Sequence, residues 1–190
     1  DGRYSDEALT LIGEVRRAAA TAGFYSMCVP EQLGGGGLGH LAYYAGWEEL
    51  FRVCAPQNWL MLYVISHWAF GPSRLLEQIT PQARERILAP MMAGTASMCF
   101  GLSEPGAGSD AAALSTRAVR DGDGWRISGR KIWTTNAPVA DYCIVFAVTD
   151  AHVEHSCVRC PEYRRRGAGL RHGSAMRAGR PASPYPRDEG

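Results

Sequence analysis

The sequence lacks a long hydrophobic run, a basic stripe and a secretory leader. Its most apolar stretch, residues 59–70 (WLMLYVISHWAF), has 12 residues, whereas a helix that spans a bilayer needs about 20, so we expect no membrane span. Residues 1–150 hold 12 Lys and Arg against 15 Asp and Glu, a net charge of −3, and residues 151–190 hold 8 against 4, a net charge of +4. The first 150 residues show no basic stripe, so nucleic acid is not an expected partner.

Lysine is nearly absent, because the chain contains one lysine, Lys131, and 19 arginines. The sequence shows no structural reason for this ratio. Four of the six cysteines lie in apolar surroundings, where cysteine packs as a small hydrophobe. They are Cys28, Cys54, Cys99 and Cys143. Because no secretory signal opens the chain, we expect a reduced, cytoplasmic protein.

The first 95 residues predict helices and loops. Residues 5–22 carry an apolar stripe at helical spacing, with Ser5 as a capping residue and Gly23 just beyond the end. Thr80 and Pro81 start another helix, which should end before Pro90. The predicted helices are 5–22, 40–53, 59–70, 72–79 and 81–88.

Two features of this half have competing interpretations. The run Gly34 to Gly37 is expected to be a flexible turn, and a loop that binds phosphate is the alternative. A P-loop in particular is rejected, because the Lys and Ser/Thr that this motif requires do not follow the glycines. His67 lies in the apolar run 59–70, and we expect a core histidine that is hydrogen-bonded to backbone rather than a catalytic one.

From residue 96 the pattern changes to strands, expected at 96–102, 114–120, 125–128, 130–135 and 142–149. Asp121-Gly122-Asp123-Gly124 is the strongest hairpin signal in the chain. The loop 103–109 holds two hydroxyls, a carboxylate and two glycines, which let backbone N–H groups approach a ligand. The segment 133–136 (WTTN) sets a large aromatic beside adjacent hydroxyls. Together these segments suit a flat ring rich in heteroatoms.

LSEPGAGSD at residues 102–110, followed by DGDGWRISGRKIWTTNAPVADYCIVFAVT at residues 121–149, resembles the acyl-CoA dehydrogenase family. In that family a TEPxAGSD-type loop and a WIT-type strand hold the isoalloxazine of FAD. The resemblance implies FAD as cofactor, an acyl-CoA substrate, electron-transfer flavoprotein as electron acceptor and a homo-oligomer at full length. The implied cofactor-binding residues are Phe100, Leu102, Ser103, Gly108, Ser109, Trp133, Thr134 and Thr135.

The resemblance also implies individual roles. Thr135 would address the N5 edge of the flavin, Trp133 would pack beside the ring, and the backbone at 102–103 would meet the pyrimidine end. Ser109 would meet the cofactor or the CoA arm, and it is the implied substrate-binding residue. Two positions depart from the family pattern: Ser103 replaces the usual threonine and keeps its hydroxyl, while Phe100 stands where a tyrosine is common and lacks one.

The resemblance implies an α+β fold: an N-terminal all-α helical bundle, residues 1–95, followed by an incomplete antiparallel β-barrel-type domain, residues 96–150, with the flavin motifs. The similarity ends near Asp150, and residues 151–190 hold 8 Arg, 5 Gly and 4 Pro without a periodic apolar face. We therefore expect an aberrant or disordered tail. The tail cluster His152, His155, Cys157 and Cys160 offers zinc-type ligands but matches no finger pattern, so no metal is expected.

The implied function is the FAD-dependent α,β-dehydrogenation of an acyl-CoA thioester, by a chain expected to be truncated. The family carries its base, a glutamate, on a C-terminal helical domain, and nothing after Asp150 matches it. No catalytic residue is assigned, because Glu104 belongs to the binding loop. Two alternatives stay open: a flavin-dependent monooxygenase of the same fold, which an acyl-CoA-dependent flavin reduction assay would separate, and a non-catalytic remnant without flavin absorbance.

Overall fold

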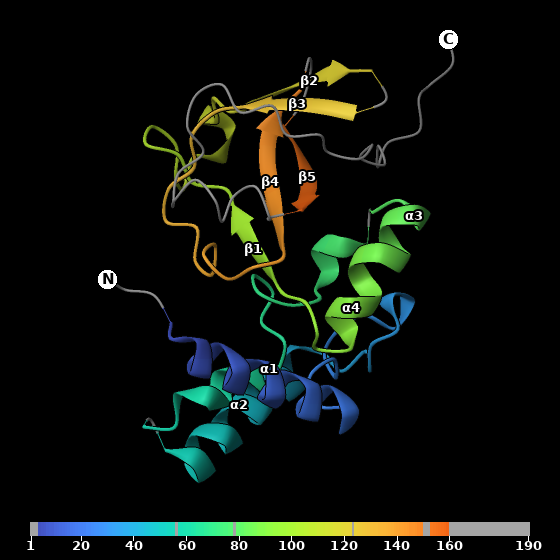
Figure 1. The fold of residues 1–190 in the computed structure, drawn as a ribbon, viewed down its shortest axis with the longest axis vertical. Coiled ribbons are helices and arrows are strands. Elements are labelled where there is room, and N and C mark those ends of the chain that lie inside the picture. Colours follow the sequence, from blue (N-terminus) through green and yellow to red (C-terminus); the bar gives the residue numbers. More distant parts are fainter. Residues whose placement is uncertain (1–3, 56, 78, 123, 150–152, 160–190) are drawn as a thin grey trace. The chain divides into compact units, whose positions relative to one another are not determined.

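The computed structural model describes residues 4–55, 57–77, 79–122, 124–149 and 153–159. By its contacts the chain divides into two compact units. The helical unit comprises Asp1–Glu77 and Arg84–Ser97, and the strand unit comprises Gln78–Ala83 and Met98–Gly190. Figure 1 shows long helices in the first and a five-stranded sheet in the second.

The first helix, α1 (Asp6–Thr21), forms as its sequence predicts. The Ser5 hydroxyl accepts a hydrogen bond from the backbone N–H of Ala8 at 3.2 Å, which caps the helix. Gly23 follows the last turn with φ +83°, a left-handed conformation that glycine adopts without strain. Ile12, Gly13 and Ala19 are the buried residues of α1. The cap and the terminator therefore act here as the sequence indicates, whereas the apolar stripe is buried only in part, since Leu11 is 40% exposed.

The glycine run is a packed loop rather than a flexible turn. It follows the short 3₁₀ helix η1 (Glu31–Leu33). A Cβ on Gly35 would lie 2.1 Å from the carbonyl oxygen of Val29, so only glycine fits there. The N–H groups of Gly35, Gly36 and Gly37 donate to the carbonyls of Pro30, Ser26 and Val29 at 3.1, 3.0 and 2.9 Å. Because these N–H groups are already bonded within the loop, it offers no phosphate cradle.

The second predicted helix is present as α2 (His40–Cys54), but the next two predictions are wrong. Residues 59–70 hold only the 3₁₀ turn η2 (Trp59–Tyr63), and the described residues between 72 and 79 hold only η3 (Arg74–Leu76). The backbone N–H of Ser66 donates to the carbonyl of Tyr25 at 2.9 Å, a bond outside any local helix. The Nδ1 atom of His67 accepts from the N–H of Ala69 at 3.2 Å, so the predicted histidine–backbone bond is present on a half-buried ring.

The helix that starts at Pro81 continues further than predicted. The hydroxyl of Thr80 accepts from the N–H of Ala83 at 3.2 Å, which confirms the predicted cap. The segments are α3 (Pro81–Ala83), the π turn η4 (Arg84–Leu88) and α4 (Ala89–Met92). Pro90 is the second residue of α4 and follows directly on the π turn η4, so the chain stays helical through the proline. The expected stop before Pro90 is therefore wrong.

The strand unit is a mixed sheet of order β1-β4-β2-β3, with β5 also paired to β4. Its strands are β1 (Met98–Gly101), β2 (Arg117–Asp121), β3 (Gly124–Ser128), β4 (Tyr142–Val148) and β5 (Val153–Arg159). β2 and β3 form the predicted hairpin, with Asp121 opposite Gly124. β1 and β4 are parallel, as are β2 and β4 where Arg117 meets Val148, while β4 and β5 are antiparallel. Figure 1 shows β5 beside β4.

Three expectations for this unit are corrected. The sheet is mixed rather than antiparallel, and over the described residues it does not close into a barrel. The connection from β1 to β4 includes a complete hairpin, so it is long enough to return the chain in the parallel sense. Residues 130–135 form no strand, because Trp133 has φ +57°. Residues 153–159 form a strand within the expected tail, and residues 160–190 lie outside the described part.

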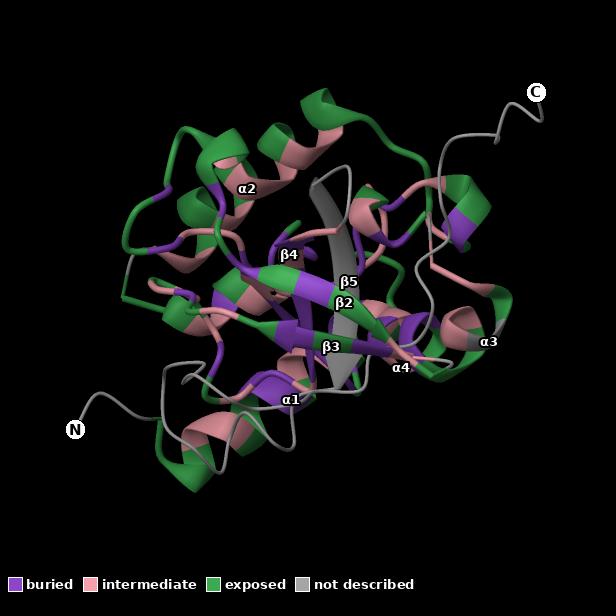
Figure 2. Ribbon diagram, turned by 90° about the horizontal axis from the view of Figure 1, so that it is seen from above, coloured by how far each residue is buried: buried purple, intermediate pink, exposed green. Residues whose placement is uncertain are grey.

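The core of the strand unit surrounds β4, whose successive residues are buried on both faces of the sheet. Buried and exposed residues alternate along β3 (Figure 2), whereas β4 is buried at five of its seven positions. Cys99 and Cys143 are buried in this core, as small hydrophobes would be. Its buried cluster comprises Cys99, Ala118, Trp125, Ile127, Ala137, Ala140, Cys143, Val145 and Ala147. Within the described residues, no helix has the length and apolarity to cross a bilayer.

Candidate functional site

The two motifs singled out in the sequence meet in the strand unit. The backbone N–H of Ile132 donates to the carbonyl of Ser103 at 2.9 Å, which sets segment 131–136 beside the loop that follows β1. That loop is closed on itself, because Glu104 and Ala107 exchange backbone hydrogen bonds of 2.7 and 3.2 Å. Motifs that are about 30 residues apart in sequence therefore lie together.

A buried ion pair joins the same two segments. Lys131 Nζ donates to Glu104 Oε1 at 2.8 Å and to the carbonyl of Leu102 at 2.9 Å. The lysine and glutamate side chains are only 1% and 2% exposed. Glu104 Oε2 accepts from the N–H and the hydroxyl of Ser115 at 2.7 and 2.6 Å, and Oε1 accepts from the N–H of Thr116 at 2.9 Å. Each carboxylate oxygen thus has two donors, the condition under which a buried charge is tolerated.

These contacts fix the protonation of Glu104. Burial by itself raises the pKa of the carboxyl, but hydrogen bonds from Lys131, Ser115 and Thr116 outweigh it and lower the pKa to about 2. Burial lowers the pKa of Lys131, and the adjacent carboxylate opposes that shift. A carboxylate with so low a pKa and no unoccupied oxygen is a poor proton acceptor. The geometry therefore gives Glu104 a structural role and none as a base.

Segment 133–136 presents two of the predicted contacts to solvent. Trp133 has φ +57° and is 87% exposed, and Thr135 is also exposed. Thr134 lies between them with its Oγ1 buried and without a hydrogen-bond partner. Asn136 has φ +68°, and its Nδ2 donates to the carbonyl of Met98 at 3.0 Å. Of the two adjacent threonines, only Thr135 has a hydroxyl that an incoming ligand can reach.

The remaining predicted residues lie along β1 and the loop after it. Phe100 is half-buried, with its ring edge-on to that of Phe146 at 4.8 Å between centroids. Leu102 and Ser103 contribute the carbonyls that Lys131 and Ile132 bind. Gly108 and Ser109 are exposed, and a Cβ on Gly108 would meet no atom within 4 Å. This stretch therefore supplies backbone anchors at its start and an open surface at its end.

Sequence reasoning missed the residues that hold the site together: Lys131, Ser115, Thr116 and Asn136. One signal for Lys131 was present, because it is the single lysine among 19 arginines. The ammonium of Lys131 is compact and bonds to two acceptors. A guanidinium is a larger, planar group with its donors in a fixed arrangement. The single lysine of the chain therefore stands where an ammonium meets two acceptors in a buried polar contact.

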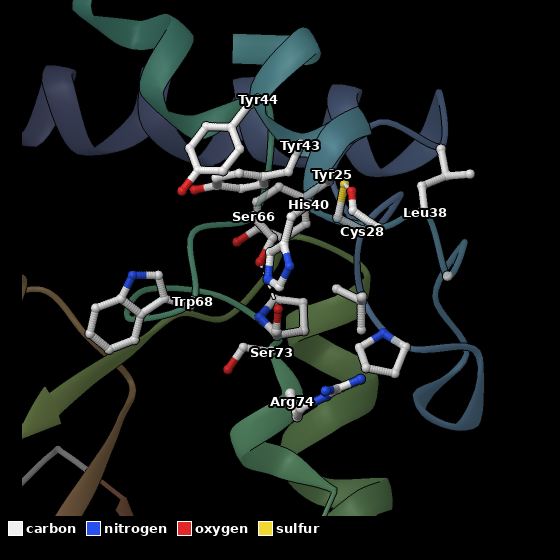
Figure 3. A pocket seen from close by; sticks show the side chains of 15 residues that line it. Tyr25, Cys28, Leu38, His40, Tyr43, Tyr44, Ser66, Trp68, Ser73 and Arg74 are labelled. Carbon is white, nitrogen blue, oxygen red and sulfur yellow. Dashed lines mark hydrogen bonds between the residues drawn. The ribbon is translucent and has the colours of Figure 1, made fainter.

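The helical unit contains a separate pocket of about 640 Å³ (Figure 3). His40, Tyr43 and Tyr44, from the start of α2, line it together with the loop after α1 and residues from 66 to 74. None of the eight predicted cofactor-binding residues lines this pocket. It is therefore a different feature from the paired motifs.

The polar groups around this pocket show no sign of activation. The Ser66 hydroxyl donates to the carbonyl of Pro72 at 2.8 Å, and Arg74 pairs with Glu77 at 3.3 Å. Burial raises the pKa of the Cys28 thiol, which keeps the sulfur protonated. Over the described part of the chain no cluster of three or more potential metal ligands occurs. His152 and Cys160 of the tail cluster lie outside the described residues.

Comparison with known protein families accounts for both units. Residues 3–95 match the model of the acyl-CoA dehydrogenase N-terminal domain, and residues 99–184 match that of the middle domain. The chain belongs to the acyl-CoA dehydrogenase family. The middle-domain match extends beyond Asp150, where the sequence analysis ended the similarity, and it includes β5.

Individual relatives agree with this assignment. The chain is 44% identical over 128 residues to bovine mitochondrial short-chain specific acyl-CoA dehydrogenase, which covers 67% of this chain and 30% of the relative. It is 36% identical over 137 residues to the caffeyl-CoA reductase–Etf complex subunit CarC of Acetobacterium woodii, covering 72% of this chain and 35% of that protein. The chain thus spans about a third of the length of the curated relatives that it matches.

A solved relative connects the fold with a flavin. A glutaryl-CoA dehydrogenase from Mycobacterium smegmatis, in complex with FADH2, superposes with a TM-score of 0.63 at 26% identity, covering 85% of this chain and 42% of that one. The residues present here fit such a group: an exposed indole stands beside an exposed hydroxyl, and the loop that carries Gly108 and Ser109 is open to solvent. An aromatic face with a few edge donors is what an isoalloxazine ring requires.

Proposed function

We propose that this chain forms one side of the flavin site of an FAD-dependent acyl-CoA dehydrogenase, in which an acyl-CoA thioester loses hydrogen from Cα and Cβ. The observation that carries the proposal is the Ile132–Ser103 hydrogen bond at 2.9 Å. It joins the SEPGAGSD loop to the WTTN segment, and each alone would be a weak signal. The family assignment and the FADH2-bound relative support the same interpretation.

Each exposed residue has a defined task in this proposal. The Thr135 hydroxyl donates to the edge of the ring, and the Trp133 indole packs beside the ring and keeps water from it. Ser109 is exposed, and its hydroxyl would bond to the cofactor or to the CoA arm. The chemistry that bound FAD would supply is acceptance of the hydride from Cβ. The proton from Cα goes to a base that is not Glu104, because both oxygens of that carboxylate are already bonded.

The proposed partners follow from the same assignment. Electrons that reach the flavin have to leave it, and we propose electron-transfer flavoprotein as the acceptor. A relative that is 36% identical is itself named as a subunit of a complex with Etf, which supports this proposal. We also propose a homo-oligomer for the full-length protein, since one side of a cofactor site needs a second surface to complete it.

Titration with FAD tests the proposal on the 190-residue chain itself. The flavin fluorescence should be quenched in the wild type, and Trp133→Ala should weaken binding because the ring loses its stacking partner. Loss of one aromatic contact typically weakens the interaction by about 0.5–1.5 kcal/mol, in addition to the effect of the apolar area that is no longer buried. Trp68→Ala is the matched control, because Trp68 is also exposed, at 52%, but belongs to the helical unit. Equal effects of the two substitutions, or no quenching at all, would count against the proposed site.

A further inference from the structure

We propose that Glu104 and Lys131 are positioning residues: their buried pair fixes the loop after β1 against segment 131–136, so that Trp133 and Thr135 form one surface before any cofactor arrives. This inference rests on the proposed function, which it deepens. Neither side chain is accessible to a ligand, since that of Glu104 is 2% exposed and that of Lys131 is 1% exposed. Their effect on a cofactor has to be transmitted through the segments that they hold.

Segment 131–136 is anchored at both ends. At its start Lys131 Nζ bonds to Leu102 O and Glu104 Oε1, and the next residue, Ile132, bonds through its N–H to Ser103 O. At its end Asn136 Nδ2 bonds to Met98 O at 3.0 Å. Three residues lie between these anchors, and two of them, Trp133 and Thr135, are the exposed ones. The pair therefore controls a short span whose freedom is limited on both sides.

The conformation of that span requires such anchors. Trp133 and Asn136 adopt φ values of +57° and +68°. A tryptophan with positive φ is disfavoured by its own Cβ, so this conformation persists only where the surrounding chain imposes it. Without the pair, segment 132–135 would relax toward extended backbone, and the indole and the hydroxyl would no longer face a ligand together.

The same carboxylate also reaches a third segment. Glu104 accepts from Ser115 and from the N–H of Thr116, and the carbonyl of Thr116 in turn accepts from the N–H of Val148 at 2.8 Å. A Cβ on Gly129 would lie 2.3 Å from the Thr116 hydroxyl oxygen, so the chain entering segment 131–136 passes closely against this residue. The pair thus ties the exposed surface to the end of β4 rather than to one flexible loop.

The decisive variant is the double substitution Glu104→Gln/Lys131→Met. Each single change leaves one buried charge without its partner, and this destabilises a fold for reasons unrelated to the cofactor. The double change removes both charges while it keeps the side-chain sizes similar. We expect its melting temperature to lie above those of the two single variants, since no unpaired buried charge is left. We expect FAD affinity to stay about 10–100-fold lower, as when groups that orient a ligating side chain are removed.

Amide hydrogen exchange gives a readout that needs no cofactor. In the double variant the Ile132 amide should exchange about tenfold faster than in the wild type, because its bond to Ser103 opens more often. Arg126→Met is the matched control, since it breaks the exposed Arg126–Asp121 pair of the same unit and should change neither exchange at Ile132 nor FAD affinity. Wild-type exchange and wild-type FAD affinity in the double variant would overturn the proposal.

Asn136→Gly keeps the inference testable if the buried variants fail to fold. Glycine accepts φ +68° but lacks the amide that bonds to Met98, so this change removes the second anchor without leaving a buried charge. We expect weaker FAD binding and faster Ile132 exchange than in the wild type; no change in either would overturn the idea of a doubly anchored span.

The anchoring and the proposed function can fail separately. If the Ile132 amide exchanges faster in the double variant but the wild type binds no FAD, the result supports the anchoring and overturns the proposed function.

Discussion

The pocket of the helical unit and the paired motifs of the strand unit differ in how their polar groups are arranged. The pocket has about 640 Å³ of space and several aromatic side chains, but its cysteine thiol is protonated and its arginine is exposed and paired with a neighbouring glutamate. In the motifs, a buried carboxylate with four donors supports an exposed indole and hydroxyl. The organised polar network below an exposed surface, rather than the volume of empty space, thus distinguishes the motifs from the pocket.

The largest expected effect breaks that network. Lys131→Met leaves the Glu104 carboxylate buried without its cationic partner, which typically costs about 3–5 kcal/mol in the free energy of unfolding. Urea unfolding of the wild type and the variant measures the difference. Arg126→Met, which breaks an exposed ion pair, should cost no more than about 1 kcal/mol. Similar losses in both variants would mean that the network is no more important than a surface contact.

A second prediction uses the pKa of Glu104. Because folding lowers this pKa from 4.5 to about 2, the contribution of Glu104 to stability is full above pH 4.5 and is lost as the pH falls through 2. The loss should be about 3 kcal/mol, from a shift of two to three units. Unfolding free energies measured across this pH range should fall more steeply for the wild type than for Glu104→Gln, whose amide does not titrate. Parallel curves would contradict the assignment.

The sequence predicted the parts of the fold that local patterns determine. The Ser5 cap, the stop at Gly23 and the hairpin that turns between Asp121 and Gly124 each depend on a few adjacent residues. The run 59–70 gave no such signal, since it is apolar on nearly every face and burial alone does not specify a helix. Its backbone is held by a distant partner, as the bond from Ser66 to Tyr25 shows.

The residues of the candidate site also divide into those that local sequence patterns predict and those that they do not. The two motifs and their exposed residues were recognisable, because hydroxyls, glycines and an aromatic stand close together in sequence. Lys131 and Glu104 are 27 residues apart, and their contact depends on the sheet register, which local patterning does not give. The strand predicted at 130–135 failed for a related reason: isoleucine, tryptophan and threonine are typical of strands, but Trp133 is held in a left-handed conformation by the anchors on both sides.

The next prediction concerns the glycine loop of the helical unit. Gly35→Ala would place a Cβ 2.1 Å from the backbone carbonyl of Val29, so the loop has to shift and its internal hydrogen bonds have to weaken. Overpacking of this kind typically costs about 1–3 kcal/mol. Thermal unfolding should show this loss, while FAD binding by the strand unit should be unchanged. A loss of FAD affinity equal to that in Trp133→Ala would contradict the assignment of the cofactor surface to the strand unit alone.

The smallest effect separates the two adjacent threonines. Thr135→Val removes an exposed hydroxyl, which should leave stability unchanged but weaken FAD binding by up to about tenfold, the value of one hydrogen bond.

Thr134→Val removes a hydroxyl oxygen that is buried and has no hydrogen-bond partner, so stability should stay equal or rise slightly while FAD binding is unchanged. Ser73→Ala is the matched change at the pocket, because the Ser73 hydroxyl is likewise buried without a partner, and it should behave as Thr134→Val does. Fluorescence titration and thermal unfolding of the three variants measure both quantities. If Thr134→Val weakened FAD binding and Thr135→Val did not, the segment would present the other hydroxyl to the ring, and the cofactor contacts assigned here would shift by one residue.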